Sequence, residues 1–227
     1  MRLSFKNLRP YLAAGSAYLL LTCLALYQLV ANFSSAIPGI AGQHEDFAQF
    51  YWNVWWFQDA VFHLGRDPFF TNYILYPNTI NLAYHTFTPV LNVFALPVYA
   101  SFGLTVAINA WIVAGLVFNG LAMFAFLRHR TVPSGLAFLG GALFAFAPAT
   151  MSRVSFVHLS MVPNGWVPMS LLAWDWLIEQ RNWKWSILLG IVLYATLMTD
   201  IQFLVWLAIL LPMYALYTLF RAGKPAR

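Results

Sequence analysis

Charge is scarce in this chain. Only 8% of its residues are Asp, Glu, Lys or Arg, whereas 61% are hydrophobic and 18% are aromatic. A typical soluble domain carries about 25% charged residues. The composition therefore excludes an ordinary soluble fold and predicts an integral membrane protein. The one cysteine, Cys23, lies in an apolar segment and cannot form an internal disulfide, so we expect it to be a packing residue.

Several chemical signatures are also missing. The sequence has no serine or cysteine nucleophile arrangement and no phosphate-cradling glycine loop. Its net charge of +5 is divided among short segments that form no continuous basic stripe, so no nucleic-acid partner is expected. No ionisable residue falls clearly at mid-membrane, which disfavours an ion-coupled transporter. Asp175 and Glu179 lie near the inner end of a predicted span, where we expect them to be solvated or to snorkel, with pairing to Arg181 or Lys184 as the alternative.

Long apolar runs predict an all-α membrane domain, residues 1–227, with about six transmembrane helices and a large outer first loop. The expected spans are residues 11–32, 104–127, 132–149, 164–180, 185–199 and 201–220. Of the 12 Lys and Arg residues, all but Arg66 and Arg153 fall in segments that this arrangement places inside. The positive-inside rule thus predicts cytoplasmic termini and a first loop outside a bacterial cytoplasmic membrane.

Two apolar segments decide the number of predicted spans. Residues 88–103 are short and contain Pro89 and Pro97, so we expect a helix lying in the outer interface rather than another span. A single helix over residues 185–220 would be about 54 Å long, far more than a bilayer needs. A hairpin turning near Thr199-Asp200 would be shorter, and we predict it although neither glycine nor proline marks the turn.

Carboxylates, imidazoles and aromatic residues gather in the first loop, residues 33–103. An acidic pair, Glu45-Asp46, precedes an aromatic run that predicts a helix from Asp46 to Leu64 lying along the membrane. The pair is either a cap for that helix or a general base that deprotonates an acceptor hydroxyl or amine. The helix is either an anchor for the loop or one wall of a site for a lipid-linked substrate.

The other polar candidates of the outer segments are His44, His85, His158, Arg66 and Arg153. His44 and His85 are either hydrogen-bonded loop histidines or ligands of a phosphate or a divalent metal. No metal site is predicted, because a metal usually needs three or four well-placed ligands. Arg66 and Arg153 are natural phosphate partners, with lipid headgroup contact or pairing with Asp67 as the alternative. His158, in the turn after the third span, would join the same cluster.

A set of short motifs runs through the loop and the third span. It comprises Glu45-Asp46, Trp52-Asn53-Val54-Trp55-Trp56, Gly65-Arg66-Asp67-Pro68-Phe69-Phe70-Thr71, Leu75-Tyr76-Pro77-Asn78, Leu82-Ala83-Tyr84-His85-Thr86, Thr88-Pro89 and Ala145-Phe146-Ala147-Pro148. This set resembles the N-terminal half of the bacterial GT-C glycosyltransferases, multispanning enzymes that take a sugar from a polyprenyl-phosphate carrier at the outer face. The resemblance implies Asp46 as base, Glu45 assisting, and Arg66, His85 and Arg153 near the carrier phosphate.

The chain departs from that family in length. Its members are usually much longer, and their second half helps to close the site for the carrier lipid. Two hypotheses therefore stand side by side. One is glycosyl transfer from a polyprenyl-phosphate sugar. The other is a non-catalytic scaffold or accessory subunit of a larger membrane complex, whose Trp- and Phe-rich surfaces contact lipid and other membrane subunits.

Overall fold

The computed structural model of the chain describes residues 5–39 and 45–222. The helices are α1 (Phe5–Ala25), α2 (Tyr27–Ala31), α3 (Glu45–Gln58), α4 (Pro89–Phe102), α5 (Leu104–His129), α6 (Ser134–Ala145), α7 (Pro148–Ser155), α8 (Trp166–Gln180), α9 (Trp183–Thr199) and α10 (Ile201–Ala222). A π-helical turn, Asp59–His63, extends α3, and 3₁₀ turns occupy Leu82–Tyr84 and Leu159–Met161. Strands β1 (Phe70–Thr71) and β2 (Ile80–Asn81) pair antiparallel, with Phe70 opposite Asn81. The predicted helical class is confirmed.

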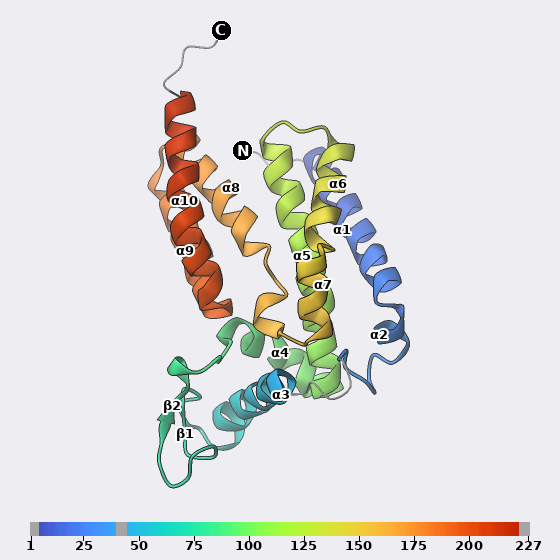
Figure 1. Cartoon of the computed structure of the whole chain (residues 1–227), viewed down its shortest axis with the longest axis vertical. Coiled ribbons are helices and arrows are strands. Elements are labelled where there is room, and N and C mark those ends of the chain that lie inside the picture. Colours follow the sequence, from blue (N-terminus) through green and yellow to red (C-terminus); the bar gives the residue numbers. More distant parts are fainter. Residues whose placement is uncertain (1–4, 40–44, 223–227) are drawn as a thin grey trace.

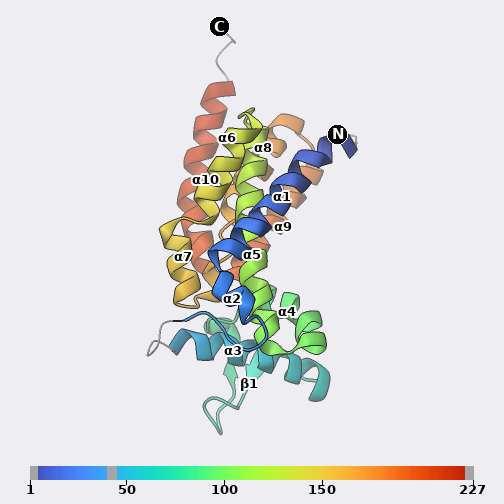
Figure 2. The same cartoon turned by 90° about the vertical axis from the view of Figure 1, so that its right-hand side faces the viewer.

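The long helices form a bundle with the first loop at one end. Helix α3, helix α4 and the β-hairpin lie opposite the start of α1 and the end of α10 (Figures 1 and 2). We call the two ends of the bundle the loop end and the terminal end. Helix α5 is central and packs against α1, α4, α6 and α8. Its buried side chains include Ile108, Ile112 and Leu116, which are fully enclosed.

Within the described residues, three helices are long and apolar enough to cross a membrane, namely α1, α5 and α10. Helices α6 and α7 would form a fourth span if the 40° bend between them lies within one crossing. Helix α8 has 15 residues and α9 has 17, so they are about 22 and 26 Å long, short of the roughly 30 Å of hydrocarbon. The chain thus has the helices of a membrane protein, while six crossings stay a prediction.

The breaks between helices have local causes. The segment predicted as one span, residues 132–149, is divided because α6 ends at Ala145 and Pro148 starts α7. Gly103, with φ 89°, separates α4 from α5 in a conformation that glycine adopts readily, so residues 88–103 form a separate helix as expected. The predicted turn at Asp200 is also confirmed. Asp200 is extended there, and its Oδ1 accepts the Gln202 amide at 2.8 Å, which caps α10.

Tyr18 holds α1 against α5 and α6. Its side chain is fully buried, stacks on Phe138 with ring centroids 4.8 Å apart and donates its hydroxyl to the Phe138 carbonyl at 2.9 Å. Gly120 and Gly141 leave room for the ring, since a Cβ atom at either position would collide with it. Small residues of this kind allow helices in a membrane to approach closely.

A charged network closes the terminal end, where it joins α5, α8 and α10. Tyr214 donates to the carboxylate of Asp175 at 2.9 Å, and Arg130 Nη1 lies 3.5 Å from Asp175 Oδ2. The side chain of Glu179 is half exposed, and its Oε1 lies 3.1 Å from His129 Nε2. Asp175 is only 3% exposed, so the expectation of a solvated end is wrong for this residue. Packing of α5 and α10 over α8 encloses the carboxylate and supplies the partners that a buried charge needs.

Candidate functional site

A cavity of about 670 Å³ opens at the loop end of the bundle. Its lining consists of Phe69, residues 83–89 of the loop and residues 197–202 of the turn between α9 and α10. These segments are far apart in the sequence and meet because α4 packs against α9. We call this space the loop-end cavity. It combines an imidazole, a carboxylate, hydroxyl groups and an amide side chain with apolar walls.

Hydrogen bonds from α3 and from within the loop fix the loop side of the cavity. Asn53 of α3 is fully buried, and its Nδ2 donates to the Thr86 carbonyl at 2.7 Å. The Oδ1 of Asn81 accepts the Ala83 amide at 2.9 Å and so starts the 3₁₀ turn before His85. Leu82 within that turn is fully buried against aromatic side chains of α3. These contacts fix the conformation of the loop segment that forms this wall of the cavity.

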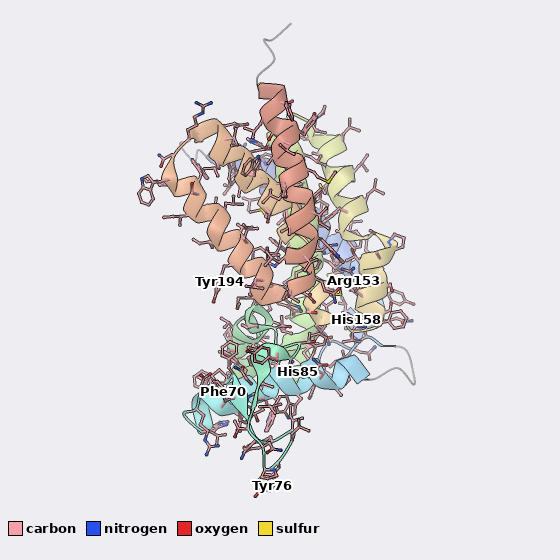
Figure 3. All side chains as sticks on the ribbon, turned by 60° about the vertical axis from the view of Figure 1, so that its left-hand side comes forward. Phe70, Tyr76, His85, Arg153, His158 and Tyr194 are labelled. Carbon is pink, nitrogen blue, oxygen red and sulfur yellow. The ribbon has the colours of Figure 1, made fainter. Side chains whose placement is uncertain are left out.

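His85, a residue predicted to contact a phosphate, lies in the lining of this cavity. Figure 3 shows it at the loop end of the bundle, below Arg153 and His158. Its ring reaches solvent, yet the surrounding loop removes part of its hydration, which lowers the pKa of His85 below its usual 6.5. The imidazole is therefore mostly neutral at pH 7 and can both donate and accept a hydrogen bond.

Asp200 is the candidate that sequence reasoning treated only as a turn residue. It lines the cavity although it is 9% exposed. Its Oδ2 accepts the hydroxyl of Ser160 at 2.6 Å, and its Oδ1 accepts the Gln202 amide. The one signal in the sequence is a lone carboxylate at a predicted outer turn. Its meeting with residues 83–89 depends on tertiary packing.

Arg153 lies near Asp200 but does not line the loop-end cavity. Its guanidinium carbon is 5.3 Å from the ring centroid of Trp206 and 6.0 Å from that of Phe203. Its Nη1 donates to the Met161 carbonyl at 3.3 Å, and its charge interacts favourably with Asp200. The positive charge of Arg153 therefore stabilises the buried carboxylate of Asp200, and its contacts with Phe203 and Trp206 link α7 to α10.

The acidic pair falls at the start of α3. The structure describes the backbone of Glu45 and Asp46 as the first turn of that helix, but their side chains lie outside the described residues, as does all of His44. The helix predicted from Asp46 to Leu64 is confirmed, because α3 and its π-helical turn run to His63. The roles predicted for Glu45, Asp46 and His44 stay predictions.

Arg66 and His158 stand apart from the loop-end cavity, since neither lines it. Arg66 is exposed, and its amide donates to the Ala60 carbonyl at 2.8 Å just beyond the π-helical turn. His158 is partly buried in the segment after α7, with its ring centroid 6.3 Å from that of Phe156. Their predicted contact with a phosphate therefore stays a prediction.

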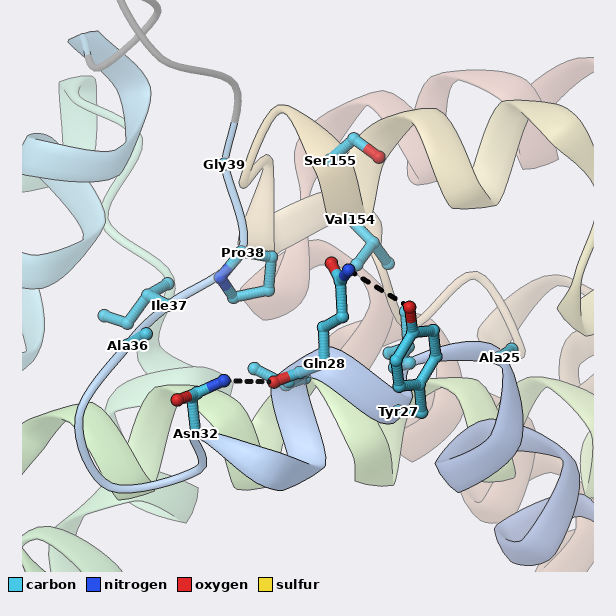
Figure 4. A pocket seen from close by; sticks show the side chains of 12 residues that line it. Ala25, Tyr27, Gln28, Asn32, Ala36, Ile37, Pro38, Gly39, Val154 and Ser155 are labelled. Carbon is cyan, nitrogen blue, oxygen red and sulfur yellow. Dashed lines mark hydrogen bonds between the residues drawn. The ribbon is translucent and has the colours of Figure 1, made fainter.

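A second cavity, of about 410 Å³, lies beside α2 (Figure 4). It is lined by residues 25–29, Asn32, residues 36–39, Val154 and Ser155. Within it Gln28 donates to the Tyr27 hydroxyl at 3.2 Å, and Asn32 donates to the Gln28 carbonyl at 3.0 Å. Among the described residues, its lining has no carboxylate, imidazole, lysine or arginine. The loop-end cavity is therefore the better candidate for chemistry.

Within residues 5–39 and 45–222, no three His, Cys, Asp or Glu side chains are grouped so as to hold a metal ion. The loop-end cavity instead offers a buried carboxylate, a neutral imidazole and hydroxyl groups. Such a set can bind a polar headgroup and can hold or pass on a proton. No family model, no curated protein and no solved structure matches the chain.

Proposed function

We propose that this chain is a GT-C-like glycosyltransferase that binds a polyprenyl-phosphate sugar in the loop-end cavity, at the outer face of the membrane. The observation that carries the proposal is a polar cavity, with His85 and Asp200 in its walls, at one end of an apolar helix bundle. A carrier of this kind has a polar head and a long apolar tail. The exposed Ile201 and Val205 at the start of α10 offer that tail an apolar surface beside the cavity.

In such a transfer, an acceptor oxygen attacks the anomeric carbon of the sugar. The bond from that carbon to the phosphate oxygen breaks, polyprenyl phosphate leaves with the electron pair, and a base takes the acceptor proton. Asp46, assisted by Glu45, is the predicted base. His85 would donate a hydrogen bond to the leaving phosphate, and Asp200 would orient the sugar. In this proposal Arg153 acts by positioning Asp200.

The proposal is tested with the full chain in vesicles and a panel of undecaprenyl-phosphate sugars labelled in the sugar. Asp46→Asn is expected to lower the rate of transfer about a hundredfold or more, because it removes the base. Asp67→Asn is the matched control. Asp67 Oδ1 accepts the Phe69 amide at 2.9 Å, and an asparagine oxygen can accept the same bond. Transfer at the wild-type rate by Asp46→Asn would contradict the proposed base.

A non-catalytic subunit is the second candidate, and the surface of α10 favours it. Only 17% of the apolar span in α10 is buried, and Trp206, Ile209 and Met213 are among its exposed side chains. Either lipid or helices of another subunit cover this face. Purification from native membranes in mild detergent separates the candidates. A stoichiometric complex that assembles equally well with Asp46→Asn supports the subunit, whereas a homogeneous chain that transfers sugar supports the enzyme.

A further inference from the structure

The turn between α8 and α9 presents two basic side chains at the terminal end of the bundle. Arg181 follows the last residue of α8, Lys184 lies in the first turn of α9, and both are exposed. Neither forms an ion pair within the part of the chain that the structure describes. The carboxylates of α8, Asp175 and Glu179, instead face side chains at the end of α5. The positive charge of the turn is therefore left for an outside partner.

Hydrogen bonds fix the conformation of this turn. Arg181 has φ 46° and ψ 41°, a left-handed conformation that glycine or asparagine adopts more readily than arginine. Its amide donates to the Leu177 carbonyl at 3.0 Å, and Asn182 Oδ1 accepts the Lys184 amide at 3.1 Å, which caps α9. A residue held in such a conformation points to a role for its side chain.

An exposed apolar stripe on α9 begins at the same turn. Trp183, Ile187 and Ile191 follow one another at intervals of four residues, so they lie on one face of the helix. All three are at least half exposed, and the exposed Tyr194, labelled in Figure 3, continues the stripe. Two cations thus stand at one end of an apolar surface, which is the arrangement of charge and apolar area that a phospholipid complements.

The lengths of the helices bring this turn to the level of lipid headgroups. Helices α8 and α9 are about 22 and 26 Å long, whereas the 22 residues of α10 extend over about 33 Å. Figure 1 shows the turn short of the end of α10. In a membrane, helices shorter than the hydrocarbon are accommodated by thinning of the bilayer or by snorkelling of the residues at their ends. Either adjustment brings lipid phosphates and the two cations together.

We propose that the turn between α8 and α9 binds the headgroup of an anionic phospholipid. Arg181 and Lys184 pair with the headgroup phosphate, Trp183 lies at headgroup level, and an acyl chain runs along Ile187 and Ile191. Basic residues beside a membrane attract anionic lipid, and Trp favours the interface. An acidic protein or a nucleic acid would match the charge but would leave the stripe uncovered. The site lies at the opposite end from the loop-end cavity and does not depend on the proposed glycosyl transfer (Figure 1).

The full chain in dodecyl maltoside micelles is titrated with dioleoylphosphatidylglycerol or with zwitterionic dioleoylphosphatidylcholine. The rise in melting temperature with lipid concentration gives each dissociation constant. The wild type is expected to bind the anionic lipid about tenfold or more tightly than the zwitterionic one. Arg181→Asn and Lys184→Gln should each weaken binding of the anionic lipid about fivefold, because one basic residue near an anionic surface contributes about that factor. The double variant should show no preference.

Two controls separate a site from diffuse charge. Arg181→Lys keeps the positive charge and is expected to keep the preference within about twofold. Arg9→Gln removes one exposed charge from α1, which starts at the same end of the bundle (Figure 2), and should also change the affinity less than about twofold. Inorganic phosphate should not raise the melting temperature, because it has no chain to cover the stripe.

Arg181→Asn is expected to melt at the wild-type temperature without added lipid, because asparagine tolerates the left-handed conformation. If it does not fold, Lys184→Gln decides, since that variant retains the amide that Asn182 accepts. Equal affinity of the wild type for the two lipids, or an unchanged preference in Lys184→Gln, overturns the site. An equal loss in Arg9→Gln overturns it as well, and an equal rise with inorganic phosphate overturns the assignment to a lipid.

Discussion

The hydroxyl of Ser160 donates to Asp200 Oδ2 over 2.6 Å, and both side chains are buried. The bond joins residues 40 positions apart, one in the 3₁₀ turn after α7 and the other at the start of α10. Because Asp200 lines the loop-end cavity, this bond holds a carboxylate in place at the candidate site.

Ser160→Ala is expected to lower the free energy of unfolding by about 1–3 kcal/mol, because a buried carboxylate loses a donor. Thermal unfolding in detergent measures the change. Ser155→Ala is the control, since Ser155 is exposed and its hydroxyl donates to the Met151 carbonyl of its own helix. A change within about 0.5 kcal/mol is expected there. Equal effects in the two variants would contradict a stabilising role for the Ser160 bond.

Tyr214→Phe tests the charged network at the terminal end. Removing the hydroxyl leaves the buried Asp175 with one donor fewer, so we expect a loss of about 1.5–3 kcal/mol in stability. Tyr194→Phe removes the same atom from an exposed tyrosine of α9, labelled in Figure 3, and should leave the melting temperature nearly unchanged. An unchanged melting temperature in Tyr214→Phe would show that the packing of α10 does not depend on this contact.

Gly141→Ala tests the packing of α1 against α6. The added methyl group would collide with the Tyr18 ring and displace its hydroxyl from the Phe138 carbonyl, at a cost of about 1–3 kcal/mol. At Gly190 in α9 nothing lies within 4 Å of an added Cβ. Gly190→Ala should therefore be neutral or stabilise the helix by up to about 1 kcal/mol. Similar melting temperatures for the two variants would refute the close approach.

Anion binding at the loop-end cavity should depend on pH through His85. Because partial burial lowers the pKa of His85, the ring gains its proton only as the pH falls below that lowered pKa, and the added positive charge then strengthens binding. Sulfate affinity should rise between about pH 7.5 and pH 5. Asp200 and Tyr84 are the other ionisable side chains among the described residues that line this cavity.

His85→Gln tests whether His85 causes the pH dependence of sulfate binding. The amide keeps a hydrogen-bonding group but does not titrate, so the rise in sulfate affinity should become smaller in this variant. His158→Gln, which changes a histidine outside the cavity lining, should retain the wild-type slope. An identical slope in His85→Gln and the wild type would assign the pH dependence to another group.

The predicted orientation can be measured with introduced thiols, because replacing Cys23 by alanine removes the one native cysteine. Tyr76 at the tip of the β-hairpin is 81% exposed, and Lys184 in the first turn of α9 is exposed at the terminal end. In intact cells an impermeant maleimide should label Tyr76→Cys. It should label Lys184→Cys only after permeabilisation. The reverse pattern would invert the topology and place the loop-end cavity inside.

Local sequence signals predicted much of the helical framework correctly. The independent helix at residues 88–103 and the turn at Asp200 follow from proline positions and from the length limit of a bilayer. The break at residues 146–147 was missed, although Pro148 was a local signal for it. A proline can start a helix as well as interrupt one, so composition alone did not separate α6 from α7.

The sequence by itself determined that the chain is helical and built for a membrane, because scarce charge and long apolar runs are properties of single segments. Only the tertiary structure decided that Asp175 is enclosed by α5 and α10, and that His85 and Asp200 share a cavity. Those outcomes depend on which helix faces pack together. In a chain whose helices are apolar on nearly all sides, hydrophobic periodicity does not specify that choice.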